Sequence, residues 1–290
     1  MSSGILNLDK PKGMTSHDVI RQVRRVTGIR KVGHSGTLDP MATGVLLVCV
    51  GRATRLTEYM LSGDKSYRAV VRLGVETDTY DADGRVISSR PVGISREEVE
   101  AALHEFSGSI DQVPPMYSAI KHKGRPLYAI ARRGLTVERE PRQVRISRVT
   151  MVGWSPPEFT FEVVCSAGTY VRSLAHDLGQ RLGCGAHLTG LVRCRSGRFE
   201  LEDAIPLREL APDNWKRHLQ PMDAAVGDLP ILMLSHGAAQ QLIQGQSIPW
   251  RPEHPVAKLA RAHTENGGFF AIVRPSEDGT RWSPHKVFVE

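Results

Sequence analysis

The sequence GHSGTLDPMATG, residues 33–44, runs directly into an apolar segment, GVLLVCV, at residues 44–50. Its glycines let the backbone turn sharply and approach a ligand closely. Pro40 disfavours a helical conformation at Asp39, so the carboxylate projects from a loop that enters a buried strand. Because the edge of a buried strand is a rigid mount, Asp39 is a candidate nucleophile. The other interpretation is a turn-forming aspartate that bonds its own backbone.

The rest of the chain has the composition of a globular protein. Its 290 residues, 40% hydrophobic and 24% charged, are enough for one large domain and a small one. The N-terminus lacks the apolar stretch of a signal peptide, and the longest apolar run, residues 45–50, is too short for a membrane span. We therefore expect a cytoplasmic protein without membrane association. The four cysteines lack CxxC pairs and zinc-site spacing, which predicts reduced thiols and no metal.

The positive charge is concentrated in one segment. Residues 121–148 hold nine Lys or Arg against two Glu, and this excess of seven equals the net charge of the whole chain, +7. Tyr128 and His122 are interleaved with these cations and offer rings on which bases can stack. The segment is therefore predicted to contact a phosphate backbone, with a solvated charged face as the alternative.

Hydrophobic periodicity and capping signals predict a strand-rich fold with interspersed helices. Expected helices span residues 15–28, 54–61, 95–108, 169–182 and 235–244. Expected strands span residues 44–50, 67–75, 142–152, 158–165, 268–274 and 286–290. Since strands and helices do not alternate regularly, the fold class is α+β, with a domain boundary near residues 221–230.

Several segments occur in the order typical of one enzyme family. They are NLDKPKGMTS (7–16), GHSGTLDPMATG (33–44), DKSYR (64–68), RLG (72–74), TDT (77–79), PMYSA (115–119), SAGTYVR (166–172) and GAHL (185–188). Over roughly residues 4–205 the chain resembles the tRNA pseudouridine synthase B family. The resemblance implies the pseudouridine synthase fold, a central mixed, mainly antiparallel sheet flanked by helices. It further implies a catalytic domain over 1–226, with an RNA-binding insertion at about 115–143, and a small β-rich, PUA-like domain over 227–290.

The resemblance also implies a reaction. This family isomerises the T-loop uridine at tRNA position 55 by breaking the N1–C1′ bond, turning the uracil over and joining C5 to C1′. Nothing is oxidised and no group is imported, so no cofactor or metal is expected. The implied partner is the T-arm and elbow of tRNA, bound by a monomer without a guide RNA or obligate protein partner.

The family's catalytic residues map onto matching positions of this sequence. Asp39 is the implied nucleophile, and Arg172 the guanidinium that keeps it ionised and oriented. Tyr67 is implied to pack on the uracil and is also a candidate base for a sugar proton. Tyr170 and Leu191 are implied to complete the substrate pocket. Taken singly, these residues would be interpreted as a surface arginine, core tyrosines and a core leucine.

Further residues are assigned to RNA binding by the same resemblance. His34 is implied to stack where the extruded base was, because a flipped uridine leaves a space that needs filling. Lys10 is expected either to contact a phosphate or to support the loop that holds Asp39. Within the insertion we expect four phosphate contacts, Lys121, Lys123, Arg132 and Arg133.

Two other functions remain open at this point. One is a tRNA-binding folding helper that opens and re-forms the tRNA elbow, and the other is a guide-dependent rRNA synthase. Met41-Ala42 after the proline is typical of the bacterial proteins and not of the guided relatives. The sequence leaves undecided whether Asp39 attacks C1′ of the sugar or C6 of the base.

Overall fold

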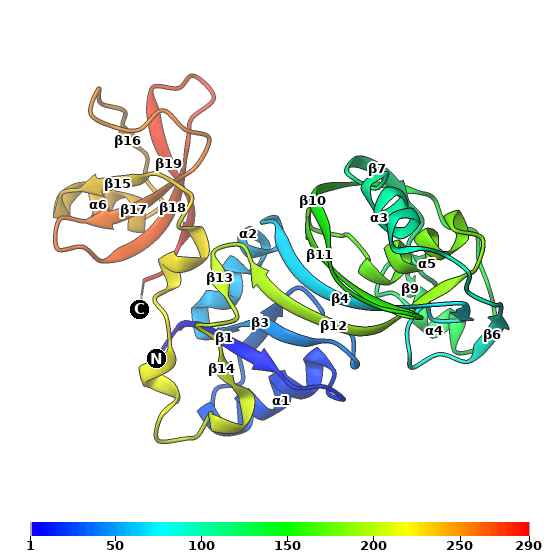
Figure 1. Ribbon diagram of the computed structural model, residues 1–290. Coiled ribbons are helices and arrows are strands. Elements are labelled where there is room, and N and C mark those ends of the chain that lie inside the picture. Colours follow the sequence, from blue (N-terminus) through cyan, green and yellow to red (C-terminus); the bar gives the residue numbers. More distant parts are fainter. Residues whose placement is uncertain (1, 290) are drawn as a thin grey trace.

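A computed structural model describes residues 2–289 (Figure 1). The helices are α1 (Ser16–Thr27), α2 (Thr57–Leu61), α3 (Arg96–His104), α4 (Leu127–Ala131), α5 (Val171–Arg181) and α6 (His236–Ile243), with 3₁₀ helices η1 (Gly51–Leu56), η2 (Leu207–Glu209), η3 (Trp215–His218) and η4 (Met222–Val226). The strands are β1 (Gly4–Lys10), β2 (Val32–Ser35), β3 (Thr43–Val50), β4 (Lys65–Leu73), β5 (Val75–Thr77), β6 (Val86–Ser89), β7 (Gly108–Gln112), β8 (Lys121–His122), β9 (Arg125–Pro126), β10 (Arg142–Ser155), β11 (Glu158–Cys165), β12 (Ala186–Ser196), β13 (Phe199–Glu200), β14 (Ile205–Pro206), β15 (Ile231–Leu234), β16 (Ile248–Pro249), β17 (Ala260–Thr264), β18 (Phe269–Pro275) and β19 (Arg281–Val287).

A ten-stranded sheet forms the body of the molecule. Its order is β14-β1-β3-β12-β4-β11-β10-β7, with β2 added to β3 and β13 to β12. The β1–β14 and β3–β12 pairings are parallel, and the other pairings along this path are antiparallel. Helix α1 lies at one end of the sheet, whereas α5 packs on β12 and α3 on β10 near the other end (Figure 1). The predicted α+β fold, with a mixed and mainly antiparallel sheet flanked by helices, is confirmed.

Strand β3 is buried on both faces. Leu46 and Val48 belong to the main hydrophobic core, whereas Val45, Leu47 and Cys49 pack in a second cluster on the opposite side of the sheet. A strand that is covered on both faces has a continuous run of apolar residues in its sequence, which explains the segment GVLLVCV at residues 44–50. The loop before β3 is therefore mounted on one of the most constrained strands of the sheet.

The predicted helix starts and ends are largely confirmed. Thr15 and Asp18 form the expected capping box of α1, and Gly28 ends that helix in the left-handed conformation with φ 70°. Ser95 caps α3 in the same way, although α3 ends at His104, before Gly108. The expected helix over 54–61 is half 3₁₀, in η1, and half α-helical, in α2.

Several strands were not predicted, and one predicted strand has the wrong bounds. The long strand β12 was not predicted, because Arg193 and Arg195 interrupt its apolar alternation, yet it lies at the centre of the sheet. The expected strand over 286–290 starts earlier, since β19 spans Arg281–Val287. Position 290 lies outside the described residues.

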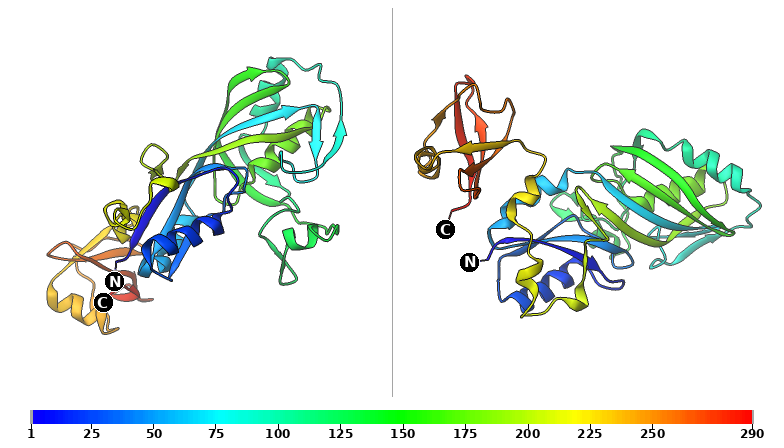
Figure 2. Two further views of the ribbon diagram at one scale, coloured as in Figure 1. Left: turned by 90° about the horizontal axis from the view of Figure 1, so that it is seen from below. Right: turned by 60° about the vertical axis from the view of Figure 1, so that its left-hand side comes forward.

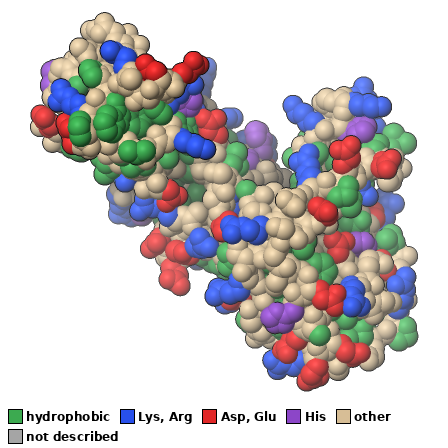
Figure 3. All heavy atoms as spheres, turned by 90° about the horizontal axis from the view of Figure 1, so that it is seen from above, with side chains coloured by type: hydrophobic (Ala, Val, Ile, Leu, Met, Phe, Trp, Pro, Cys, Tyr) green, Lys and Arg blue, Asp and Glu red, His purple; other side chains and the backbone are tan. Residues whose placement is uncertain are grey.

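A five-stranded sheet of order β15-β17-β18-β19-β16 forms a separate body at the C-terminal end (Figures 1 and 2). Its core includes Leu242 of α6, Phe270 and Trp282. Arg52 and Arg55 of η1 donate to the carbonyls of Phe288 (3.1 Å) and Val287 (2.6 Å), which ties this body to the larger one. Figure 3 shows the smaller body from above, at the upper left, joined to the rest through a narrower middle. Among the described residues, no helix combines the length and apolarity needed to cross a membrane.

Candidate active site

A cleft of about 960 Å³ brings together side chains from distant parts of the chain. Asp39 enters it from the loop between β2 and β3, Tyr67 from β4, and Arg172 from the first turn of α5. Its lining also includes His34, Tyr170, Leu191 and, from the insertion (residues 115–143), Tyr117, Tyr128 and Arg132. Six of the residues singled out in the sequence as catalytic or substrate-binding thus surround one space.

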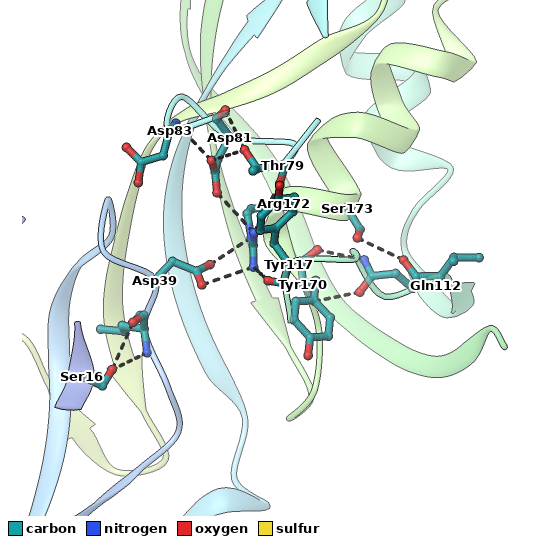
Figure 4. Close-up of polar contacts among 12 residues, drawn as sticks. Ser16, Asp39, Thr79, Asp81, Asp83, Gln112, Tyr117, Tyr170, Arg172 and Ser173 are labelled. Atoms are coloured by element: carbon teal, nitrogen blue, oxygen red, sulfur yellow. Dashed lines mark hydrogen bonds and ion pairs between the residues drawn. The ribbon is translucent and has the colours of Figure 1, made fainter. Parts of the chain in front are cut away.

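Asp39 and Arg172 face each other as a two-point pair (Figure 4). Arg172 Nε lies 3.0 Å from Asp39 Oδ2, and Arg172 Nη2 donates to Asp39 Oδ1 at 3.2 Å. The arginine side chain is 4% exposed, whereas that of Asp39 is 32% exposed. The guanidinium therefore fixes the carboxylate from the buried side and leaves its other face open to the cleft.

Arg172 makes three further contacts that hold its own position. Its Nη1 lies 3.3 Å from both the carbonyl of Thr79 and Asp81 Oδ2, and its Nη2 donates to the carbonyl of Tyr117 at 2.9 Å. Asp81, which is buried, was not predicted as a site residue. The acidic run of residues 78–83, which begins within the matching TDT segment (77–79), was the signal that could have identified it.

Burial raises the pKa of the Asp39 carboxyl above its ordinary value. The negative charge of Asp81 raises this pKa further, while the guanidinium of Arg172 opposes both effects. The carboxylate is thus less hydrated than one on a surface, and its ionised form depends on Arg172.

The N-terminal motif (residues 7–16) holds the Asp39 loop through hydrogen bonds. Ser16 Oγ accepts a hydrogen bond from Leu38 N (2.9 Å) and donates to the carbonyl of Leu38 (3.1 Å). On the other side of Asp39, the carbonyl of Pro40 accepts from Gly13 N at 2.8 Å. These hydrogen bonds connect the segment at 7–16 to the loop at 33–44 on both sides of Asp39.

Lys10 also connects the N-terminal motif to the Asp39 loop. Its side chain is fully buried and donates to the carbonyls of Pro11 (2.9 Å), Met14 (2.6 Å) and Pro40 (3.4 Å). Burial lowers the pKa of its ammonium to about 8. Lys10 does not line the cleft, so of its two expected roles the support of the Asp39 loop fits this position, and a phosphate contact does not.

Tyr67 and Tyr170, the two tyrosines predicted as site residues, form walls of the cleft. Burial raises the pKa of both phenols above their ordinary value, so they are protonated at neutral pH. Gln112, another residue that sequence reasoning missed, clamps the backbone of Tyr170: its Oε1 accepts from Tyr170 N (2.7 Å) and its Nε2 donates to the Tyr170 carbonyl (3.0 Å). Leu191, on β12, is 7% exposed and contributes apolar surface.

Arg193 is a buried cation that sequence reasoning also missed. It lines the cleft while only 1% exposed, and donates to the carbonyls of Val45 (2.6 Å) and Gly36 (3.1 Å). Among residues 2–289 no carboxylate forms an ion pair with it. Gly44 allows the close approach, since a Cβ there would lie 2.3 Å from the carbonyl oxygen of Arg193. The position of Arg193, two residues after Leu191 on the same face of a strand, was the available signal.

The structure separates the remaining RNA-binding candidates. His34 lines the cleft, and burial together with the charge of Arg193 lowers the pKa of its imidazole, so the ring is neutral. Arg132 also lines the cleft, over the ring of Tyr128 at 5.5 Å. Lys121, Lys123 and Arg133 are exposed on the insertion, outside the cleft.

Comparison with known proteins identifies the family. Residues 24–171 match the model of the TruB family pseudouridylate synthase N-terminal domain, and residues 172–227 match that of the tRNA pseudouridylate synthase B C-terminal domain. The chain belongs to the TruB family of pseudouridylate synthases. Since pseudouridylate synthases are isomerases, it is an isomerase.

Curated members of the TruB family match nearly the whole chain. The tRNA pseudouridine synthase B of Stutzerimonas stutzeri (strain A1501) is 44% identical over 98% of this chain and 95% of its own length. The enzyme of the same name from Symbiobacterium thermophilum is 52% identical over 83% of this chain and 82% of its own length. The family resemblance inferred from the sequence motifs is therefore confirmed.

Solved structures similar to this TruB family chain come from larger assemblies. A chain of a Cbf5-Nop10-Gar1 complex is 27% identical, with a TM-score of 0.76 over 99% of this chain and 85% of that one. A chain of an H/ACA RNP bound to a substrate RNA containing 2′-deoxyuridine is 26% identical, with a TM-score of 0.75 over 99% and 85%.

Proposed function

We propose that this chain converts uridine 55 in the T-loop of tRNA into pseudouridine, with Asp39 as nucleophile and without a guide RNA. The observation that carries the proposal is the Asp39 carboxylate, held at two points by Arg172 and open to a cleft with aromatic walls. The names of the curated relatives, tRNA pseudouridine synthase B, support tRNA as the substrate.

In the proposed reaction the Asp39 carboxylate, which lines the cleft, attacks the bound uridine or stabilises the charge that develops on it. Breaking the N1–C1′ bond leaves an electron-poor sugar carbon, which an adjacent carboxylate traps or stabilises, as in retaining glycosidases. Attack at C6 of the base is the alternative route, and it too requires an ionised carboxylate. Arg172 serves both routes because it favours the ionised form and fixes its orientation.

The detached uracil must turn over while it stays bound. Tyr67 and Leu191 provide the surfaces for it, and the raised pKa of Tyr67 favours a phenol that donates a hydrogen bond over one that removes a sugar proton. His34 lies at the same cleft with a neutral ring, which suits stacking in the space left by an extruded base. Of its two roles, Tyr67 is therefore proposed to bind the base.

The insertion is proposed to hold the tRNA backbone over the cleft, within a catalytic domain spanning 1–226. Lys121, Lys123, Arg132 and Arg133 are exposed, and within the described residues none of them is paired with a carboxylate. Replacing all four by glutamine is expected to weaken tRNA binding at low salt. The slope of log K against log salt concentration should fall by about 3 in magnitude, because each phosphate contact contributes about 0.7–0.9.

This prediction is checked by filter binding of tRNA between low and physiological salt. A matched fourfold variant neutralises exposed cations outside the insertion and is expected to keep the slope of the unmodified protein; these are Arg208, Lys216, Arg217 and Lys258. An unchanged slope in the fourfold variant would contradict a phosphate role for the insertion.

The raised pKa of Asp39 predicts the pH dependence of the reaction. Because only the ionised carboxylate reacts, kcat/KM should rise with pH and level off above the pKa of Asp39, which lies above the ordinary aspartate value of about 3.9. Asp83→Asn removes a negative charge that raises the pKa of Asp39 without removing a contact of Arg172, so the acidic side of the pH–rate profile should move to lower pH. Single-turnover rates across the acid range test this, and a shift of the profile to higher pH would contradict the assignment.

The proposed function is tested by tritium release from tRNA transcripts labelled with [5-³H]uridine, since C5 loses its hydrogen when pseudouridine forms. The purified chain is assayed alone, with no guide RNA, on a tRNA and on the same tRNA carrying cytidine at position 55. Release from the first transcript only would support the proposal. Binding without release would favour a tRNA folding helper, and release only with added guide RNA and proteins would favour a guided enzyme.

A further inference from the structure

Tyr80 has an unusual backbone conformation close to the active site. It has φ 66°, and among residues 2–289 the only other non-glycine residue with positive φ is Lys123. This left-handed region is unfavourable for a large side chain, so neighbouring contacts must hold the residue there. Tyr80 lies between Thr79 and Asp81, the two residues that contact Arg172 Nη1.

The conformation of Tyr80 brings two acceptors to one nitrogen. The carbonyl of Thr79 and Oδ2 of Asp81 each lie 3.3 Å from Arg172 Nη1 (Figure 4). The turn is closed by a hydrogen bond from Thr79 Oγ1 to Asp81 Oδ1 at 2.6 Å, and the Tyr80 carbonyl accepts from Leu188 N at 3.0 Å. The 79–81 turn therefore presents two hydrogen-bond acceptors to the Arg172 guanidinium in a fixed geometry.

Helix α5 holds this turn with two side chains. His176 follows Arg172 by four residues, so both lie on the same face of the helix, one turn apart. The ring of His176 stacks on that of Tyr80, with centroids 3.9 Å apart and planes 11° apart. Arg172 thus contacts the residues on either side of Tyr80, and His176 contacts Tyr80 itself.

The stack does not depend on a charge. Burial and the nearby Arg139 lower the pKa of His176, while Glu76 acts in the opposite direction, and the imidazole is neutral as a result. Its Nδ1 is buried and has no hydrogen-bond partner within the described residues. The contact that the His176 side chain makes with this turn is therefore the stacking of its ring on Tyr80.

We propose that His176 is a positioning residue: by stacking on Tyr80 it fixes the 79–81 turn and thereby orients the Arg172 guanidinium toward Asp39. The proposal rests on the proposed function, because Arg172 and Asp39 act in that reaction. Losing the ring should leave tRNA binding intact and weaken the alignment of Arg172. Since Arg172 lowers the pKa of Asp39, that pKa should then rise further.

The test compares His176→Ala with His176→Phe in single-turnover assays on tRNA. His176→Ala is expected to lower kcat about tenfold, the size of one lost ring stack, with the Kd for tRNA unchanged. The acidic side of its pH–rate profile should move to higher pH, measured over the pH range in which circular dichroism shows both proteins to be folded. His176→Phe keeps a ring face and is expected to restore both. His104→Ala, at an exposed position of α3, is the matched control and should behave as the unmodified protein.

Each outcome separates the two proposals. If the unmodified chain forms no pseudouridine, the proposed function fails. If it is active and His176→Ala keeps its rate and pH profile, the positioning role is overturned. The same holds if His176→Phe is as impaired as His176→Ala, or if the loss appears only in Kd. A double-mutant cycle with Tyr80→Ala should show coupling between the two rings, and simple additivity would also overturn the role.

Discussion

Asp39→Asn is expected to abolish pseudouridine formation, with a loss in rate of roughly 10⁴-fold or more, the size found when an enzyme loses its nucleophile. The amide keeps the shape of the carboxyl but neither attacks C1′ or C6 nor stabilises a cationic sugar carbon. The measurement is tritium release from tRNA under single-turnover conditions, together with the Kd for tRNA, which should change little.

The stability of this variant provides an internal check. A carboxyl whose pKa is raised in the folded protein destabilises the fold as pH rises through its folded pKa, because the ionised form is better solvated in the unfolded chain. At neutral pH, Asp39→Asn should therefore have a melting temperature equal to or above that of the unmodified protein. Asp203→Asn, an exposed aspartate far along the chain, serves as the matched control with full activity. Measurable pseudouridine formation by Asp39→Asn would remove Asp39 from the nucleophile's role.

Arg172→Lys should cost about 3 kcal/mol of transition-state stabilisation, roughly a 100-fold loss in kcat/KM. The substitution keeps the charge but loses the fork that contacts both oxygens of Asp39 while holding Asp81 and the carbonyls of Thr79 and Tyr117. The measurement is kcat/KM for tRNA alongside thermal unfolding, where a lower melting temperature is expected, since the buried carboxylates are then less well compensated.

Arg181→Lys offers a comparison within the same helix. Arg181 pairs with Glu105 at 2.7 Å but is 58% exposed, so its replacement should change activity and stability little. If Arg172→Lys behaved as mildly as this surface variant, the two-point contact with Asp39 would have no part in catalysis.

Local chemistry explains which features of this protein were predictable from sequence. The capping boxes at Thr15 and Ser95 depend on residues three positions apart, and both appear in the structure. The continuous apolar run of β3 reflects burial on both faces, which a short window of sequence records. Asp39, Tyr67, Tyr170 and Arg172 were identified because they lie within motifs that resemble one family, and the structure brings all four to one cleft.

Other features are set by contacts between residues far apart in the chain. From sequence, Lys10 had two possible roles and Arg193 was not singled out. Both are buried, because backbone carbonyls of the Asp39 loop and β3 accept their hydrogen bonds. Strand β12 was missed because its arginines break the alternation, while its place at the sheet centre depends on pairing with β3 and β4. Asp81 accepts a hydrogen bond from Arg172, which lies 91 residues away in the sequence. Sequence alone thus determined the family and the local helix ends and indicated Asp39 as the candidate nucleophile, since these are recorded in short segments. Only the tertiary structure decided which charges are buried and what holds Arg172, because burial and hydrogen-bond partners arise when distant segments pack together.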